Sequence, residues 1–410
     1  MSKLRVAMIA PPWLAIPPNG YGGIENVLAA LIPALMDLGV EIDLFTVGDT
    51  TIKATRKHWL FQEGQYNFIH KPIYDSLPVA IAHMMFAINY IKAKGNFDIV
   101  HCHNGFIGPF AWSLIDSAFP PVLHTLHGPP FTTQDRLDIG LPDNLPMWRE
   151  LGKNTRISIV GISKAIMAHA PKELRPHILE PVHNGIDVSQ FSYSDKKQNY
   201  FATLARFHPD KGQHIAIKLC LEGRYRLKMA GLVGDMTRFK QVLLELANPA
   251  SHYRNIVDFR YFSDRIFPHL SSGQIEYLGD LAGNRKQRFL SHAKALLFPI
   301  QWDEPFGMAP LEALACGTPV IAMNRGAMPE IIEHGVNGFL ANNEHEMLDY
   351  MKRVNEIDPA ACRQSAEEKF SARHMAEEYI KRYRQILSSR PKPMPSIKQH
   401  TLKSSAQLAR

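Results

Sequence analysis

Residues 302–322 read WDEPFGMAPLEALACGTPVIA, and two glutamates interrupt this largely apolar stretch. Glu304 precedes a Pro-Phe-Gly turn, whereas Glu312 stands among leucine and alanine in a pattern typical of a buried helix that leads into a strand. A charged group removed from water needs a partner, because burying it alone is very unfavourable. The stretch therefore predicts a helix and a strand at which two carboxylates each have a partner.

Apolar runs rich in β-branched residues alternate with helical segments through most of the chain. They lie at 4–10, 41–48, 98–104, 121–128 and 156–163, and then at 200–206, 225–231, 274–280, 293–299 and 318–323. Continuous apolar strands separated by helices indicate parallel sheets that are covered on both faces. We therefore expect an α/β protein with two Rossmann-like, doubly wound domains that face a central cleft.

Residues 184–199 separate the two series, and turn formers without apolar periodicity predict a linker there. We place an N-terminal domain at 1–188 and a C-terminal domain at 189–370. An amphipathic pattern predicts a last helix at 371–388. The remaining 389–410 are basic and rich in Pro and Ser, so we expect a disordered tail.

The chain has 410 residues, of which 45% are apolar and 21% charged. This is enough for two or three globular domains, each with its own core. The sequence has no recognisable signal peptide and no apolar run long enough to span a membrane, so we expect a cytoplasmic protein. The four cysteines form no CxxC pair, which predicts free buried thiols rather than disulfides or a zinc site.

The formal net charge of +7 raises the question of a nucleic-acid partner. Residues 1–188 are close to neutral, and much of the excess lies in the tail, at Arg390, Lys392, Lys398, Lys403 and Arg410. A solvated tail and peripheral contact with anionic lipid at the inner face of the membrane both remain open. We expect no nucleic-acid partner, and the oligomeric state is not indicated.

A glycine-rich loop with Gly20, Gly22 and Gly23 follows the first predicted strand. Its spacing does not match the G-x-G-x-x-G fingerprint, which disfavours a nicotinamide cofactor. Bare N–H groups at the start of a helix can approach a phosphate or a sugar, although a flexible entry loop is an equal alternative on this feature alone.

The segment ARFHPDKG places Arg206 at a strand end and Lys211 beyond a Pro-Asp turn. Ligands of open parallel sheets bind outside the carboxyl ends of the strands. Two cations on one side of a cleft suit a diphosphate, because Arg offers a planar fork and Lys a mobile point charge. The strand-end position favours this interpretation over unpaired surface cations.

Histidines gather at the ends of two predicted strands of the first domain. We expect His101 and His103 to point in opposite directions along their strand, and no neighbouring HxxxH or D-x-D completes a metal site, so no metal is predicted. His127 precedes Gly128, which permits a close approach of the backbone. It is either a functional residue or a satisfied histidine of the core.

The opening stretch can now be interpreted as a donor site. FGMAP begins a helix, whose free N–H groups and macrodipole stabilise an anion such as a phosphate. Glu304 precedes this N-terminus and Glu312 follows it, so the two carboxylates are expected on opposite sides of that anion. A carboxylate has two oxygens that can accept hydrogen bonds from the two hydroxyl groups of a sugar diol. One glutamate for a sugar, one for a ribose and a diphosphate between them describe a nucleotide sugar.

With these motifs, the sequence resembles the retaining glycosyltransferases of family 4, also called glycosyl transferases group 1, which have the GT-B fold. The likeness runs from GYGGIENV through TLHG, GISKAI, HNGID and ARFHPDKG to EPFGMAPLEALACGTPVIAMNRGAMPEII and HGVNGFL. The E-x7-E spacing from Glu304 to Glu312 is its most specific part. One departure is Phe207-His208, where relatives often have an apolar and then a small or acidic residue.

The resemblance implies roles for individual residues. Arg206 and Lys211 would hold the diphosphate and act in catalysis, and Glu312 would grip the ribose. His127 would lie near the anomeric carbon as a catalytic residue. Gly22 and Gly23 would lie beside the diphosphate and the acceptor. The groups around the donor sugar and phosphate would be the catalytic Glu304 and the backbone of Phe306, Gly307 and Met308.

The implied function is transfer of a hexose from a UDP- or GDP-sugar to a hydroxyl acceptor, such as a glycan, a lipid-linked sugar or a small metabolite. The absence of D-x-D and the supply of positive charge by side chains predict a reaction without metal or other cofactor, and the resemblance implies retention. An epimerase of the same fold, a non-catalytic nucleotide-sugar sensor and an NAD-dependent dehydrogenase are the alternatives. Base, sugar, acceptor and linkage are not indicated.

Overall fold

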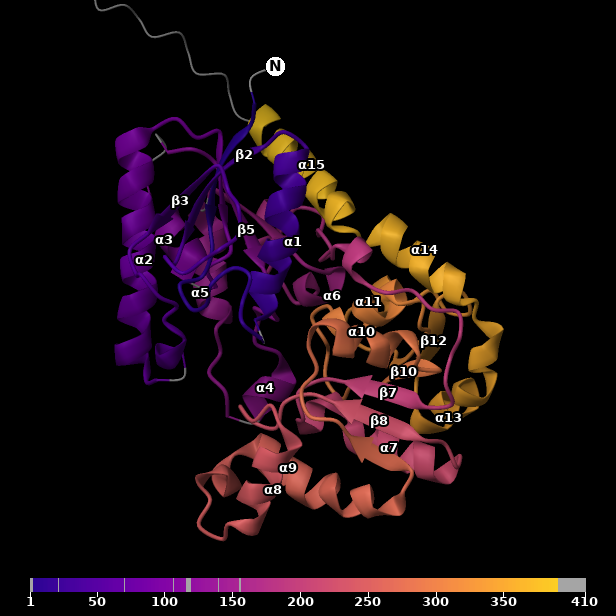
Figure 1. The fold of residues 1–410 in the computed structure, drawn as a ribbon. Coiled ribbons are helices and arrows are strands. Elements are labelled where there is room, and N and C mark those ends of the chain that lie inside the picture. Colours follow the sequence, from indigo (N-terminus) through magenta and orange to yellow (C-terminus); the bar gives the residue numbers. More distant parts are fainter. Residues whose placement is uncertain are drawn as a thin grey trace, which may run out of the picture.

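The computed structural model describes residues 3–20, 22–69, 71–105, 107–115, 119–138, 140–154 and 156–389. Within them the chain forms two lobes, each built on a six-stranded sheet whose paired strands are all parallel (Figure 1). The predicted class, two Rossmann-like α/β domains, is confirmed. The basic tail residues lie outside the described part of the chain.

The first sheet has the strand order β3-β2-β1-β4-β5-β6. Its strands are β1 (Arg5–Ile9), β2 (Glu41–Thr46), β3 (Arg56–Trp59), β4 (Ile99–Cys102), β5 (Val122–Leu126) and β6 (Ile157–Gly161). Its helices are α1 (Gly23–Asp37), α2 (Ile73–Lys94), α3 (Ile107–Ser113), α4 (Gln134–Asp138), α5 (Leu145–Asn154) and α6 (Lys164–Met167).

Alternation along β1 assigns the helices to the two faces of this sheet. Val6 and Met8 pack in the cluster that contains the buried side of α1, whereas Ala7 and Ile9 pack in the cluster that contains buried residues of α2, α3 and α5. Both faces are therefore covered, which is why β1 reads as a continuous apolar run rather than an alternating one.

The second sheet has the order β12-β11-β10-β7-β8-β9. Its strands are β7 (Phe201–Leu204), β8 (Leu227–Ala230), β9 (Ile275–Tyr277), β10 (Ala295–Phe298), β11 (Val320–Met323) and β12 (Gly338–Ala341). Its helices are α7 (Gln213–Glu222), α8 (Phe239–Ala247), α9 (Val257–Arg265), α10 (Gly283–Ser291), α11 (Met308–Ala315), α12 (Met328–Ile331), α13 (Glu344–Arg353) and α14 (Pro359–Lys369).

The last described helix, α15 (Ala372–Ser388), leaves the second lobe and runs beside α1 of the first (Figure 1). Apolar residues three and four apart give it one buried stripe, as an amphipathic helix requires. The stripe joins the cluster that holds α1: Met375, Ala376, Tyr379, Tyr383 and Ile386. The first lobe is therefore built from two separate parts of the chain.

The chain crosses between the lobes twice, and the two crossings lie side by side. Ile186 N donates to Phe370 O at 3.0 Å, and Ala372 N donates to Ile186 O at 2.8 Å. Next to them, a Cβ at Gly185 would lie 2.5 Å from Ser371 O, so only glycine allows this close approach.

Two further observations concern the cysteines and the length of the apolar helices. Cys102, Cys220, Cys316 and Cys362 are all free and buried, as predicted. Among the described residues no helix is long and apolar enough to cross a lipid bilayer.

Candidate functional site

Glu304, the first glutamate of the opening stretch, has its partner in Lys211. Lys211 Nζ lies 2.5 Å from Glu304 Oε2, and both side chains are largely buried. Trp302 Nε1 donates to the same carboxylate oxygen at 2.8 Å, and Lys211 Nζ lies 4.9 Å from the centroid of the Trp302 ring. The indole thus helps to hold the ion pair, a contribution that the sequence did not reveal.

Glu312, the second glutamate, has a separate cation. Lys286 on α10 places its Nζ 2.7 Å from Glu312 Oε1, and both side chains are mostly buried. Nothing in the polar sequence of α10 distinguishes Lys286 from its neighbours, so this partner was missed. Each glutamate therefore has its own lysine, and the two carboxylates do not share a contact.

Arg206 follows β7 and contacts a buried carboxylate. Its Nη1 lies 3.2 Å from Asp258 Oδ2 on α9; the Arg206 side chain is 46% exposed and that of Asp258 only 7%. A guanidinium has five N–H donors, so a single contact leaves most of them for a ligand. Asp258 was also missed, because it lies outside every motif that the sequence shows.

The N-terminus of α11 lies between the two glutamates in the chain. Gly307 caps the helix with a φ of 95°, a left-handed conformation that favours glycine, and a Cβ there would lie 2.8 Å from Met328 Cε. Phe306 is buried against the rings of His183 and Phe370. The helix starts at Met308, as the sequence predicts, and its first N–H groups have no partner within the helix itself. The binding of an anion at this end stays a prediction.

Residues that follow strands of the two sheets contact each other beside this helix. Ser163 Oγ, after β6, donates to the carbonyl of Pro305 at 2.7 Å. Glu330 on α12 accepts from the backbone N–H of Lys164 at 2.9 Å, and its Oε2 lies 2.9 Å from His183 Nε2. Hydrogen bonds to the anion lower the pKa of Glu330 below its usual value although burial opposes them.

In the first lobe, His127 is bound to a second histidine. His103 Nδ1 lies 2.8 Å from His127 Nε2, and His103 is completely buried. Burial lowers the pKa of His127 to about 4, so the ring is neutral at pH 7. The other nitrogen of His103, Nε2, has no hydrogen-bond partner among the described residues.

The expectation that His101 and His103 point in opposite directions is wrong. Residues two apart on a strand share a face, and their ring centroids lie 4.1 Å apart. His101 is bound to Tyr383 of α15 at 2.6 Å and to Thr125 at 2.8 Å, so it belongs to the core. Among the residues that the structure describes, no group of three or more His, Cys, Asp or Glu is arranged to hold a metal ion.

The predicted glycine loop leads into α1. Gly22 is the N-cap residue and Gly23 the first residue of the helix. A Cβ at Gly22 would lie 2.9 Å from Pro18 and 3.1 Å from the carboxylate of Glu25. Glu25 is buried, and burial raises its pKa. The structure thus gives a steric reason for Gly22 and none for Gly23, where a Cβ would meet nothing within 4 Å.

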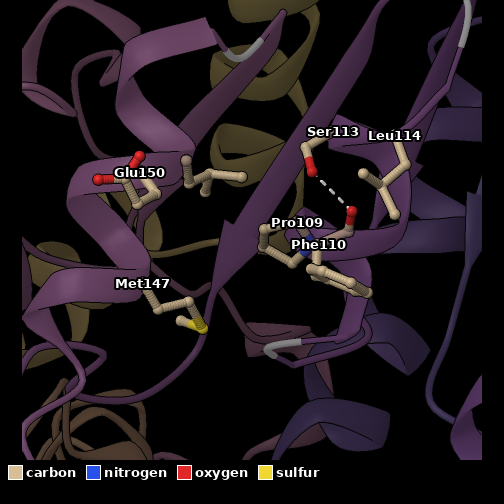
Figure 2. A pocket seen from close by; sticks show the side chains of 7 residues that line it. Pro109, Phe110, Ser113, Leu114, Met147 and Glu150 are labelled. Atoms are coloured by element: carbon tan, nitrogen blue, oxygen red, sulfur yellow. Dashed lines mark hydrogen bonds between the residues drawn. The ribbon is translucent and has the colours of Figure 1, made fainter.

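An apolar pocket of about 330 Å³ lies elsewhere, between α3 and α5 of the first lobe. Figure 2 shows Phe110 and Leu114 on one side and Met147 and Glu150 on the other, with the Ser113 hydroxyl turned to the carbonyl of Phe110. None of the residues predicted to bind the donor lines this pocket. It is therefore separate from the candidate site.

Two family descriptions match the chain, one for each lobe. The family Glycosyltransferase Family 4 matches residues 21–190, and the family Glycosyl transferases group 1 matches residues 187–369. Together they cover residues 21–369, which include the strands of both sheets except β1, and the first crossing between the lobes.

Similar proteins include an alpha-maltose-1-phosphate synthase of Mycobacterium tuberculosis, 24% identical over 93% of this chain and 100% of that protein. A D-inositol 3-phosphate glycosyltransferase of Mycolicibacterium smegmatis is 24% identical over 94% of this chain and 92% of its own length. Both likenesses extend over nearly the whole length of each protein.

Solved structures show the same fold. The sucrose-phosphate synthase of Thermosynechococcus elongatus superposes with a TM-score of 0.68 at 17% identity, over 95% of this chain and 100% of that one. HepE of Anabaena, solved in complex with UDP-glucose, superposes with a TM-score of 0.60 at 15% identity, over 93% of this chain and 100% of that one. With both lobes matched in sequence and in fold, the chain belongs to glycosyltransferase family 4 and is a glycosyltransferase of the GT-B fold.

Proposed function

We propose that this glycosyltransferase moves a hexose from a UDP- or GDP-sugar to a hydroxyl acceptor, without a metal or other cofactor and with retention of the anomeric configuration. The observation that carries the proposal is the arrangement around α11. Lys211 is paired with Glu304 before the helix, and Lys286 with Glu312 within it. The names of similar proteins support it, since HepE was solved with UDP-glucose, one relative is named for a sugar phosphate and another is named as a glycosyltransferase.

In this proposal the diphosphate lies at the N-terminus of α11 with Arg206 and Lys211 as its cations. Negative charge grows on the departing diphosphate as the sugar bond breaks. Fixed N–H donors and cations already directed at that position stabilise the transition state more than the ground state. Lys211 would exchange part of its contact with Glu304 for a phosphate oxygen, and the released carboxylate oxygen would accept from a sugar hydroxyl.

His127 would lie on the sugar side of the reacting centre. A neutral imidazole does not repel the positive charge that develops at the anomeric carbon, whereas an imidazolium would. Its Nε2 is engaged by His103, which restrains the orientation of the ring. The role of His127 is therefore to line the site with a polar, uncharged group.

Metal independence rests on the chain's own charges. The sequence contains no D-x-D, and Arg206, Lys211 and the α11 N-terminus supply positive charge where a divalent ion would otherwise serve. Glu304 and Glu312 are engaged with lysines, and neither is a free base for an inverting displacement. Attack from the face of the leaving group, with the phosphate oxygen taking the acceptor proton, gives retention.

The nucleotide is identified first. A ligand present at about a hundred times its Kd stabilises the folded state by roughly 2.7 kcal/mol. We expect UDP or GDP to raise the Tm of the protein, and ADP and NAD to leave it nearly unchanged. A shift with NAD alone would contradict the proposal.

The chemistry is then tested with the matching nucleotide sugars and a panel of hydroxyl acceptors. We expect the transfer to proceed in EDTA and NMR of the product to show the anomeric configuration of the donor. Loss of activity in EDTA that returns with a divalent ion would refute metal independence, and an inverted product would refute retention.

A further inference from the structure

Helix α9 contacts the segment after β7 at three points from one face. Asp258, Tyr261 and Phe262 are spaced as i, i+3 and i+4, so they lie together on the helix surface. Asp258 binds Arg206, and Phe262 packs edge-on against Phe207 with 5.1 Å between ring centroids. The third contact joins Tyr261 to the start of α7.

Tyr261 fixes α9 to α7 through two contacts of its hydroxyl. The oxygen accepts from the backbone N–H of His214 at 3.0 Å and lies 2.8 Å from His214 Nδ1. On the other side, Gln213 Nε2 donates to the carbonyl of Arg206 at 2.9 Å. The carbonyl of Arg206 is thus held by Gln213, the neighbour of the residue that Tyr261 binds, while Asp258 holds the Arg206 side chain.

Phe207, the apolar residue that follows Arg206, makes the second of these contacts. Its ring is fully buried and lies 5.1 Å from the rings of both Phe262 and Tyr277. An aromatic residue at this position therefore packs against α9 and anchors Arg206, the preceding residue, beside Asp258. A small residue would leave this contact empty.

The contact with Asp258 restrains Arg206 but does not prevent it from binding a ligand. The carboxylate is almost completely buried, and Arg206 is the only cation that it contacts among the described residues. The guanidinium, in contrast, is about half exposed and uses only Nη1. Asp258 therefore restrains the buried side of the Arg206 guanidinium, while the remaining N–H groups stay accessible.

We propose that Asp258 is a positioning residue for the donor diphosphate, and that α9 is the element that orients Arg206 towards it. The inference rests on the proposed function, because it takes Arg206 as a diphosphate ligand. A restrained guanidinium loses less conformational freedom when it binds, so its contact with the phosphate is stronger.

The test is a double-mutant cycle with UDP and GDP as ligands, read by calorimetry. We expect Asp258→Ala to weaken binding of the preferred diphosphate about tenfold, and Asp258→Asn, which keeps an acceptor oxygen, to weaken it less. In the Arg206→Ala background, Asp258→Ala should cause no further loss. Asp264→Asn, an exposed change on the same helix, is the matched control and should leave affinity unchanged.

The outcomes distinguish a failure of the role of Asp258 from a failure of the proposed function. Unchanged or tighter binding in Asp258→Ala would overturn the positioning role, as would an equal loss with and without Arg206. If Arg206→Ala itself leaves binding unchanged, Arg206 is not a diphosphate ligand, and the proposed function fails at that point together with the inference. Thermal melts of each variant verify folding, and Asp258→Asn serves where Asp258→Ala is unstable.

Discussion

The two lobes offer opposite chemistry where their strands end. In the first lobe, His103 and His127 directly follow β4 and β5, His124 lies within β5, and burial lowers the pKa of each. In the second lobe, the corresponding region holds ion pairs, including Lys211 with Glu304 and Lys286 with Glu312. At this edge of its sheet the first lobe, called the neutral lobe below, presents uncharged histidines, although it has ion pairs elsewhere, such as Arg5 with Asp43. The second lobe, called the charged lobe, presents ion pairs there.

This difference suggests that the two lobes have different roles in the proposed reaction. The charged lobe would bind the diphosphate and absorb the charge that develops on it, because cations act strongly at short range in a partly buried site. The neutral lobe would meet the sugar and the acceptor without adding charge near a developing cation. Donor affinity should therefore depend on the second lobe, while turnover should require both.

The largest expected effect comes from Lys211→Ala. The change removes a cation from the diphosphate and leaves Glu304 partly buried without its lysine, so we expect kcat/KM to fall about a hundredfold, which is roughly 2.7 kcal/mol. Lys218→Ala is the control, because Lys218 also pairs with a glutamate but is largely exposed. A loss below tenfold would break the assignment of donor binding to the charged lobe.

A smaller effect, about tenfold, is expected for Glu304→Gln and Glu312→Gln, but on different ligands. If Glu312 binds the ribose, Glu312→Gln weakens UDP or GDP and the sugar nucleotide alike. Glu304→Gln should weaken only the sugar nucleotide. Calorimetry with both ligands measures this, and Glu333→Gln, from an exposed pair with Lys369, is the control. Identical losses in the two variants would show that the carboxylates do not serve opposite ends of the donor.

The last prediction concerns the stability of the neutral lobe and not the binding of the donor. Burial lowers the pKa of His124 to about 3, compared with about 6.5 in an unfolded chain. Between these values the unfolded chain binds more protons, so stability is highest above pH 6.5 and falls as the pH decreases. The contribution lost between pH 7 and pH 5 is about 2 kcal/mol.

We therefore expect the Tm to fall between pH 7 and pH 5, and to fall less in His124→Leu. His345 lies exposed on α13 and serves as the control. The Tm of His345→Asn should depend on pH as that of the parent protein does. Equal slopes for the His124 variant and the parent would show that this histidine does not make the first lobe sensitive to acid.

Sequence patterns predicted the two sheets except for strands β3 and β12, the helix that begins at Met308 and the burial of all four cysteines. These features follow from local periodicity and from glycine and proline at turns. Partners in space were harder to predict. Asp258 lies 52 positions from Arg206 and Lys286 lies 26 from Glu312, and no periodicity connects residues that meet only after the sheet has formed.

The error at His101 and His103 has a different cause. The period of a strand is two, so this geometry was available from the sequence and was applied wrongly. Trp302 illustrates a real limit. Trp302 lies two residues before Glu304, and only the folded backbone shows that its N–H points at the oxygen that Lys211 also holds.

The path of α15 has a consequence for synthesis of the protein on the ribosome. Translation delivers the strands of the first lobe first, yet the surface beside α1 stays uncovered until Met375 to Ile386 have emerged. The second lobe, whose strands and helices all precede residue 370, has its complete set of elements earlier. The lobe that is made first is thus finished last, and during that interval its exposed apolar surface is where a chaperone would bind the nascent chain.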